Sequence, residues 1–249
     1  MQNENYVTYD PRLPKHKISL TKIIICLILL MYLAEIYFNA TYSDKAVILL
    51  GAKWNEGITN GQYWRFITPT FLHGNLIHLF LNLFALHIFG TELESIYGSI
   101  KFLTVFLLTS WGAILASYTF SSGIAIGASG AVFGIIGCLV IFYFKQRGKV
   151  SGATIRFKSM YTLIIINLIF GFLIPKIDNF AHLGGLITGI FVGWLLCPEY
   201  YTEKNELTQT VIVNEKSKVF NTAIFIAIVI SLLYLLTKYS IGLHAAKII

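Results

Sequence analysis

One serine and one histidine in this chain have the chemistry of a nucleophile and its base. Ser129 stands in the small-residue stretch Gly127-Ala128-Ser129-Gly130, where an apolar helix is expected to begin, and His182 opens another apolar stretch. A serine hydroxyl is a weak nucleophile unless an adjacent base takes its proton, and imidazole has a suitable pKa for that task. Taken alone, Ser129 could equally be a small packing residue. The pair predicts nucleophilic catalysis only if the fold brings the two side chains together.

A second group of polar residues could stabilise the negative charge that such chemistry creates. His78 and Asn82 are four residues apart, so they share one face of a helix, and His73 lies five residues before His78, nearer the expected outer end. Attack on a carbonyl forms an oxyanion, and donors aimed at it are often the largest catalytic contribution. Asn82, His78 and the Ser129 backbone N–H are the expected donors. As an alternative, Asn82 could be a structural hydrogen bond between helices.

Other arrangements of the same residues are weaker. Three histidines could bind zinc, but the sequence has no HExxH motif and no carboxylate beside them, so no metal site is predicted. Asp178 precedes His182 by four residues and could complete a triad. It follows a proline in an outer loop, and a helix cap or a solvated loop residue is the favoured interpretation.

The composition indicates which elements must position these residues. Apolar residues make up 56% of the 249, charged residues 12%, and the mean hydropathy is +0.70. A soluble domain would be nearer a quarter charged. Several apolar runs approach the ~20 residues that a helix needs to cross a bilayer, and they do not alternate as strands of a β-barrel would. The sequence therefore predicts an all-α polytopic membrane protein.

Seven apolar segments are expected, at residues 19–39, 71–91, 100–120, 129–145, 158–174, 181–197 and 219–237. The first is too long for the apolar core of a signal peptide and is expected to remain as a helix. The expected organisation is a short cytoplasmic segment, a six-helix catalytic core, a cytoplasmic linker, and a seventh helix with a short outer tail, at residues 1–18, 19–198, 199–218 and 219–249.

Basic residues predict the orientation. With the N-terminus in the cytoplasm, thirteen of the nineteen lysines and arginines lie on the inner side and six on the outer side. The loop at 145–158 alone carries five basic residues and no acid. The C-terminus is then expected outside. The same rule accounts for the net charge of +7 without a nucleic-acid partner.

Helix length places Ser129 below the membrane surface. From Ser129 to Lys145 is sixteen residues, or about 24 Å, and the hydrocarbon core is about 30 Å thick. The preceding residues would enter the membrane as irregular backbone, which is tolerated only against protein or a water-filled cavity. We therefore expect a polar cavity open to the outside, with Ser129 at its floor.

Glycines give a reason for the two reactive residues to meet. Gly185 and Gly189, in a row with Ala181 and Gly193, form a small-residue ridge on the sixth segment, and Gly130 begins a shorter ridge that Gly134 continues on the fourth. Such surfaces let helix backbones approach closely in lipid. If the ridges meet, His182 is carried against Ser129.

With these residues assembled, the chain resembles the rhomboid intramembrane serine proteases from about Trp64 to Pro198. The motifs that carry the likeness are Trp64-Arg65, His73-x4-His78-x3-Asn82, Gly90-x3-Glu94-x3-Gly98, Gly127-Ala128-Ser129-Gly130 and Ala181-His182-x2-Gly185-x3-Gly189. The resemblance implies a six-helix core with one extra C-terminal transmembrane helix.

The resemblance also implies roles for individual residues. Ser129 would be the nucleophile and His182 the general base and acid, while His78, Asn82 and the Ser129 backbone would hold the oxyanion. His73 matches a position that supports the first outer loop. The family needs no cofactor or metal and cleaves transmembrane segments of other proteins near the outer face. The expected partners are thus transmembrane substrates and the lipid bilayer, in a bacterial cell membrane.

Two further expectations come from the family. Many bacterial relatives have tyrosine four residues after the serine, where this chain has Phe133, so stacking on the histidine would survive without the hydroxyl. Substrate would enter past the fifth helix, which lacks a glycine ridge and carries Phe170 and Phe172.

Two other functions would also suit a polytopic helical membrane protein. A non-catalytic rhomboid-like protein that binds membrane clients would usually lack the serine or the histidine, and both are present. A transporter would need intramembrane charge, and no acidic residue is expected deep in any span.

Cys26, Cys138 and Cys197 all fall in or beside apolar runs, and they are interpreted as small core residues.

Overall fold

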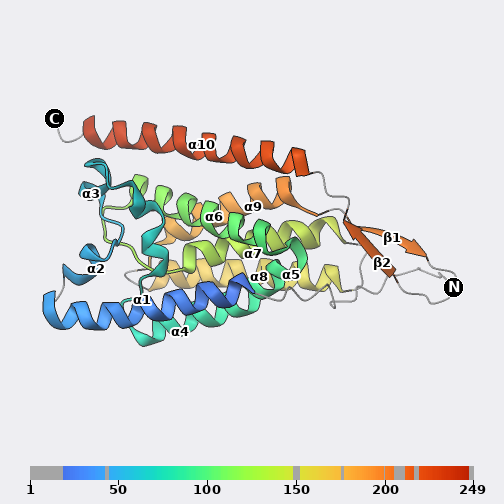
Figure 1. The fold of residues 1–249 in the computed structure, drawn as a ribbon, viewed down its shortest axis with the longest axis horizontal. Coiled ribbons are helices and arrows are strands. Elements are labelled where there is room, and N and C mark those ends of the chain that lie inside the picture. Colours follow the sequence, from blue (N-terminus) through green and yellow to red (C-terminus); the bar gives the residue numbers. More distant parts are fainter. Residues whose placement is uncertain are drawn as a thin grey trace.

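Each of the seven apolar segments predicted from the sequence is helical over most of its length (Figure 1). A computed structural model describes residues 19–42, 45–147, 152–174, 177–198, 200–204, 211–215 and 219–246. The long helices are α1 (Leu20–Tyr42), α4 (Leu76–Ala85), α6 (Ser99–Phe120), α7 (Ser129–Lys145), α8 (Ala153–Leu173), α9 (Asn179–Leu196) and α10 (Val219–Ala246). The short ones are α2 (Ala46–Leu49), α3 (Asn55–Thr59), η2 (Tyr63–Phe66), η3 (Thr68–Phe71), η4 (Leu86–Gly90) and α5 (Thr91–Tyr97).

Four predicted boundaries were wrong by five residues or more, and one of them is the end of the second span, which lies at Tyr97 instead of residue 91. The second span starts at Leu76 instead of residue 71, because the chain first forms the 3₁₀ helix η3 and Asn75 then caps α4 by accepting a hydrogen bond from the His78 N–H at 2.9 Å. α8 begins at Ala153, five residues early. α10 extends to Ala246, nine residues beyond the predicted end.

The protein is an all-α polytopic membrane protein. Six helices among the described residues are long and apolar enough to cross a membrane, and the second is the continuous run Leu76–Tyr97 made of α4, η4 and α5. The π-helical η4 sits in the middle of that run. The remaining apolar helix, α7, has only 17 residues, which is about 25 Å and short of a full span.

The segment predicted as a linker, 199–218, contains a small hairpin. Strands β1 (Tyr200–Lys204) and β2 (Val211–Glu215) pair antiparallel, with Tyr200 opposite Glu215. Figure 1 shows the hairpin beyond the end of the bundle, opposite the end that holds α2 and α3. The strands therefore add nothing to the packing around α7.

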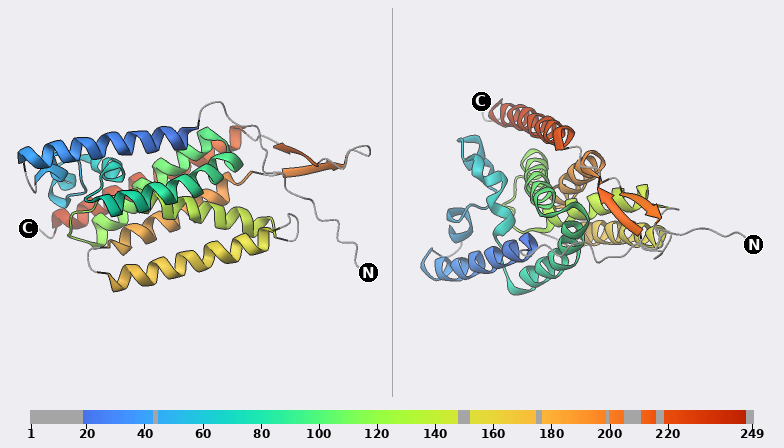
Figure 2. Two further views of the ribbon diagram at one scale, coloured as in Figure 1. Left: turned by 90° about the horizontal axis from the view of Figure 1, so that it is seen from below. Right: turned by 45° about the vertical axis from the view of Figure 1, so that its right-hand side comes forward.

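α7 is the central helix of the bundle. Thirteen of its seventeen residues are buried, whereas only four residues of the 21-residue α8 are buried. α7 packs against α6, α8 and α9, and Figure 2 shows α8 at the edge of the bundle. The helix that begins with Ser129 is thus enclosed by protein, and α8 is the most exposed of its neighbours.

The glycine rows on α7 and α9 face each other. A Cβ built on Gly185 would lie 2.0 Å from the Gly130 carbonyl oxygen, and one built on Gly189 would lie 2.0 Å from the Gly134 oxygen. Neither position leaves room for a methyl group, so only glycine permits this separation. The two ridges expected to meet do meet, and they hold α9 against α7 at two positions one helical turn apart.

Glu94, at the end of the second span, ties three helices together. Its carboxylate accepts hydrogen bonds from the backbone N–H groups of Leu20 and Thr21 at 2.7 and 3.0 Å, at the N-terminus of α1. It also accepts from the Ser99 hydroxyl, 2.7 Å away at the start of α6. The carboxylate suits the N-terminus of α1, because the first N–H groups of a helix have no partner within the helix and the helix dipole favours negative charge there.

α10 is docked on α6 by polar contacts. Trp111 Nε1 donates to the Thr237 hydroxyl at 3.1 Å, and His244 Nε2 lies 2.8 Å from the Tyr118 carbonyl oxygen. Thr119 Oγ1 and Ser240 Oγ are 2.8 Å apart. Hydrogen bonds between helices retain value in lipid, where water does not compete for the groups. The seventh helix is thereby joined to the half of α6 nearest the α2–α3 loop.

The cysteines do not share one environment. Cys138 is buried, as expected, but Cys197 is only partly buried, and Cys26 on α1 is exposed. The expectation of three core cysteines was therefore wrong for Cys26. An apolar run does not reveal which face of a lightly buried membrane helix meets lipid, because both faces are apolar.

Candidate active site

The residues just before α7 form a turn that packs closely against α4. Gly127 has a φ of +117°, which residues with a side chain rarely adopt, and its N–H donates to the Pro69 carbonyl at 2.8 Å. A Cβ on Gly127 would lie 2.6 Å from His78 Nε2 and 3.9 Å from Asn82 Nδ2. Gly127 is therefore needed both for the turn and for the space that the His78 ring occupies.

Ser129 and His182 are in hydrogen-bond contact. Ser129 Oγ lies 2.9 Å from His182 Nε2, across the α7–α9 interface. His182 is 9% exposed, and Ser129 is partly buried at the first residue of α7. A proton can pass directly from this hydroxyl to this nitrogen when the nitrogen is unprotonated.

The His182 ring is held by packing. Phe133, one turn along α7 from Ser129, stacks on the ring with centroids 4.4 Å apart and planes 13° apart. Gly185 brings α9 close enough for this contact. His182 Nδ1 is buried and has no hydrogen-bond partner among the described residues. The ring orientation thus depends on the aromatic stack and on the short helix separation.

Asp178 caps α9 instead of contacting the histidine. Its carboxylate accepts from the Ala181 N–H at 3.0 Å and from the Ser117 hydroxyl on α6. The cap is the arrangement favoured from the sequence, and it anchors the first turn of α9, which carries His182. The described residues therefore present a serine–histidine pair and not a hydrogen-bonded triad.

His78 and Asn82 lie on the other side of Gly127. Both belong to α4, and Asn82 is 6% exposed. Asn82 Nδ2 donates one hydrogen to the His78 carbonyl oxygen at 2.9 Å, which leaves its second amide hydrogen available. The first N–H groups of α7 have no partner within the helix and face a favourable dipole for an anion. His78 and Asn82 thus lie beside Gly127, two residues before Ser129.

No cluster of three or more His, Cys, Asp and Glu side chains suited to a metal ion occurs within the described ranges. His73 and His78 have ring centroids 5.0 Å apart. The polar cavity expected above Ser129 stays a prediction.

A family profile matches the part of the chain that contains these side chains. The Rhomboid domain profile matches residues 60–199, which is more than half of the chain. The chain belongs to the rhomboid family. The matched range contains all the rhomboid motifs described above, from Trp64 to Gly189.

Individual rhomboid proteins show the same likeness over different lengths. The chain is 41% identical to the rhomboid protease GluP of Bacillus subtilis over 164 residues, which is 66% of this chain and 32% of GluP. It is 36% identical to rhomboid-like protease 3 of Toxoplasma gondii over 183 residues, 72% of this chain and 67% of that protein. It is 31% identical to RHOMBOID-like protein 2 of Arabidopsis thaliana over 199 residues, 78% and 62% of the two chains. The chain thus spans between about a third and two thirds of the length of these relatives.

A buried carboxylate supports the rhomboid site from behind, and the sequence analysis missed it. Glu35 on α1 is 1% exposed, and its Oε1 accepts from the His73 N–H at 2.8 Å. His73 Nε2 in turn accepts from the Ala128 N–H at 3.4 Å, one residue before Ser129. The statement that no acidic residue lies deep in any span was therefore wrong. The sequence did indicate this residue, because Glu35 is the only acidic residue in the apolar run 19–39.

His73 must be uncharged to accept that hydrogen bond. Burial, together with the smaller effect of the neighbouring His78, lowers the pKa of His73 to about 4. The side chain is fully buried. His73 therefore supports the segment that enters α7, and its predicted support of the first outer loop stays a prediction.

Lys53 is a second residue that sequence reasoning missed. It is fully buried, and its ammonium donates to the carbonyl oxygens of Ser121 and Gly123 at 2.7 and 2.8 Å. Its backbone pairs with Ala125 in an isolated antiparallel bridge. Burial lowers the pKa of Lys53 to about 8 while the charge of Asp178 opposes this. Lys53 thus fastens the loop between α1 and α4 to the irregular segment that leads to Ser129.

Proposed function

We propose that this protein is an intramembrane serine endopeptidase that cleaves transmembrane segments of other proteins through a dyad of Ser129 and His182. The contact of 2.9 Å between Ser129 Oγ and His182 Nε2 carries the proposal. Membership of the rhomboid family, and relatives named as proteases, support it.

The first half of the proposed reaction forms an acyl-enzyme. Ser129 Oγ attacks the substrate carbonyl carbon while His182 Nε2 takes the hydroxyl proton. The carbonyl oxygen becomes an oxyanion, which Asn82, His78 and the Ser129 N–H stabilise. When the C–N bond breaks, His182 returns the proton to the leaving amine nitrogen.

The second half releases the product. A water molecule gives a proton to His182 and attacks the ester carbonyl, and the collapse of the second oxyanion returns a proton from His182 to Ser129 Oγ. Water must therefore reach a serine at membrane depth. The substrate must also unwind locally, because a helical peptide bond is hydrogen-bonded and shielded by side chains.

The proposed topology follows from the basic residues. The N-terminus and residues 1–18 lie in the cytoplasm, residues 19–198 form the catalytic core, 199–218 connect on the cytoplasmic side, and 219–249 end outside. Ser129 then faces the outer half of a cell membrane, and cleavage occurs near the outer face.

Purified full-length protein with a model transmembrane substrate tests the proposal. Ser129→Ala and His182→Ala should each lower cleavage by roughly a thousandfold or more, because residues of a dyad act as one unit. Ser122→Ala is the matched control, since that serine is exposed in the same segment and should leave cleavage unchanged. A fluorophosphonate should label wild type and not Ser129→Ala. Cleavage that survives in Ser129→Ala, or an inert wild type that binds the substrate, would instead favour a non-catalytic client-binding protein.

A further inference from the structure

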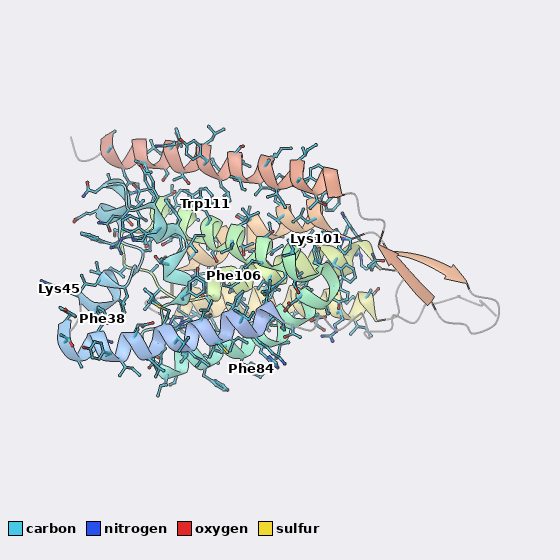
Figure 3. All side chains as sticks on the ribbon, viewed as in Figure 1. Phe38, Lys45, Phe84, Lys101, Phe106 and Trp111 are labelled. Atoms are coloured by element: carbon cyan, nitrogen blue, oxygen red, sulfur yellow. The ribbon has the colours of Figure 1, made fainter. Side chains whose placement is uncertain are left out.

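A cavity separates α10 from the first outer loop. It has a volume of about 290 Å³ and is lined by side chains from η2, α6 and α10, with Ile67 beside them. These residues are Tyr63, Phe66, Ile67, Trp111, Tyr234, Thr237, Lys238 and Ile241. Figure 3 labels Trp111 on the side of α6 that faces α10. The space lies on the far side of α6 from the α7–α9 interface and does not touch Ser129.

Most of the cavity wall is apolar or aromatic. The Thr237 hydroxyl in this wall already has its hydrogen-bond partners, because Oγ1 donates to the Leu233 carbonyl at 2.7 Å and accepts from Trp111 Nε1 at 3.1 Å. A buried water molecule needs two to four polar partners, and this wall offers too few. An alkyl chain is therefore a better occupant than water.

One cation stands at the cavity. The Lys238 ammonium lies 5.5 Å from the centre of the Tyr63 ring and 5.7 Å from that of Tyr234, within the range of cation–π attraction. Both tyrosines are exposed, at 45% and 52%. The two rings hold the ammonium beside the opening instead of letting it extend freely along the surface.

Neighbouring aromatic residues indicate the level of this opening in the membrane. Trp64 and Tyr239 are 57% and 68% exposed and flank Tyr63 and Lys238 in the chain. Tyrosine and tryptophan gather at the membrane–water interface, where lipid phosphates lie, and lysine extends its amine toward the same level. The cavity therefore joins the hydrocarbon to the headgroup region.

We propose that this cavity binds an anionic glycerophospholipid of the adjacent leaflet, with one acyl chain between α10 and η2 and the phosphate against Lys238. The acyl chain fills apolar space that a protein side chain does not, and the phosphate meets the ammonium. A net-negative lipid is preferred over a zwitterionic one because the opening presents a fixed positive charge. The site is separate from the proposed catalytic dyad and does not depend on it.

Fluorescence quenching by brominated lipids tests the proposal on the full-length protein in vesicles. Trp111 lines the cavity, and its contribution is the difference between wild type and Trp111→Phe. Vesicles of phosphatidylcholine receive increasing fractions of phosphatidylglycerol brominated on its acyl chains. Trp111 quenching should saturate at a mole fraction about fivefold lower than with brominated phosphatidylcholine.

Three variants separate a site from ordinary lipid contact. Lys238→Gln should abolish the fivefold preference, and the matched control Lys22→Gln, at an exposed lysine of α1, should retain it. Ile241→Phe, which places a larger side chain in the cavity, should reduce Trp111 quenching by either lipid. Quenching that is absent, or that is equal for both lipids and unchanged in Lys238→Gln, contradicts the proposal. Loss of the preference in inorganic phosphate would assign Lys238 to a free anion and also overturn it.

Discussion

At the scale of single residues, the reactive pair depends on side chains that do no chemistry. Phe133 and Asp178 hold His182, while Lys53, Glu35 and His73 hold the segment that enters α7. The supporting side chains lie up to 94 residues from Ser129 in the chain, and none belongs to the turn that bears the serine. Local sequence sets the turn, and distant residues set its position.

Removing the Lys53 ammonium should loosen that segment. Lys53→Met leaves the Gly123 carbonyl oxygen without this donor, and leaves Asn55 Nδ2 as the remaining side-chain donor to the Ser121 oxygen, which costs about 2 kcal/mol. We expect lower thermal stability in detergent and a lower kcat, because the approach to Ser129 is no longer fixed. Lys45→Met, at an exposed lysine near the start of the same loop, is the matched control and should change neither quantity. A Lys53→Met protein with wild-type kcat and stability would rule out this positioning role.

Acid should weaken the fold through His73. The pKa of His73 is lowered by burial from 6.5 to about 4, so between these values the unfolded chain binds a proton that the folded chain does not. Stability from His73 is full above pH 6.5 and is lost as the pH falls toward 4, by about 3 kcal/mol in total. Unfolding free energies of wild type and His73→Gln across this window should show a shallower pH dependence for the variant. His87→Gln, at an exposed histidine, should keep the wild-type slope.

At the scale of elements, the α7–α9 contact determines whether the reactive residues meet. Gly185→Ala would place a methyl group 2.0 Å from the Gly130 carbonyl oxygen, so the helices must separate. We expect about 3 kcal/mol of destabilisation and a loss of cleavage that exceeds the loss of substrate binding. Gly242→Ala on α10 is the control, because nothing lies within 4 Å of its added Cβ and alanine favours a helix. Equal stability for the two variants would contradict the packing argument.

The exposed helix α8 is the expected route for substrate. It buries four of its residues and presents Phe170 and Phe172 outward at 55% and 74% exposure. A cysteine pair that joins α8 to α4 by a disulfide, in a background with Cys26→Ala and Cys197→Ala, should abolish cleavage of a transmembrane substrate. Reduction should restore it, while fluorophosphonate labelling of Ser129 should persist throughout. Undiminished cleavage in the oxidised protein would exclude lateral entry at this helix.

At the scale of the whole molecule, the ends of the chain report the proposed orientation. α10 ends at the same end of the bundle as α2 and α3, as Figures 1 and 2 show. The distribution of basic residues predicts that this end lies outside. A periplasmic-type reporter fused after Ile249 should be active and a cytoplasmic one inactive, with the opposite result for fusions within the 145–158 loop. A reporter that reads cytoplasmic after Ile249 would invert the topology.

The sequence by itself determined the class of fold, the approximate helix segments and the two residues of the proposed reactive pair. Apolar length forces helices in a bilayer, because every backbone polar group must be satisfied internally. The glycine spacing further predicted which faces of α7 and α9 would approach. These properties depend on residue type and local spacing, and both can be read along the chain.

Only the tertiary structure decided which distant groups hold the site. Whether Asp178 contacts His182 or caps α9 depends on side-chain direction, and the cap was observed. Glu35 and Lys53 look like an isolated acid in a membrane helix and an ordinary loop lysine until the fold buries them against His73 and Ser121. In an apolar chain each helix has several faces that could pack, so hydrophobic pattern alone does not select one. Close packing and the need to satisfy each buried polar group make that selection.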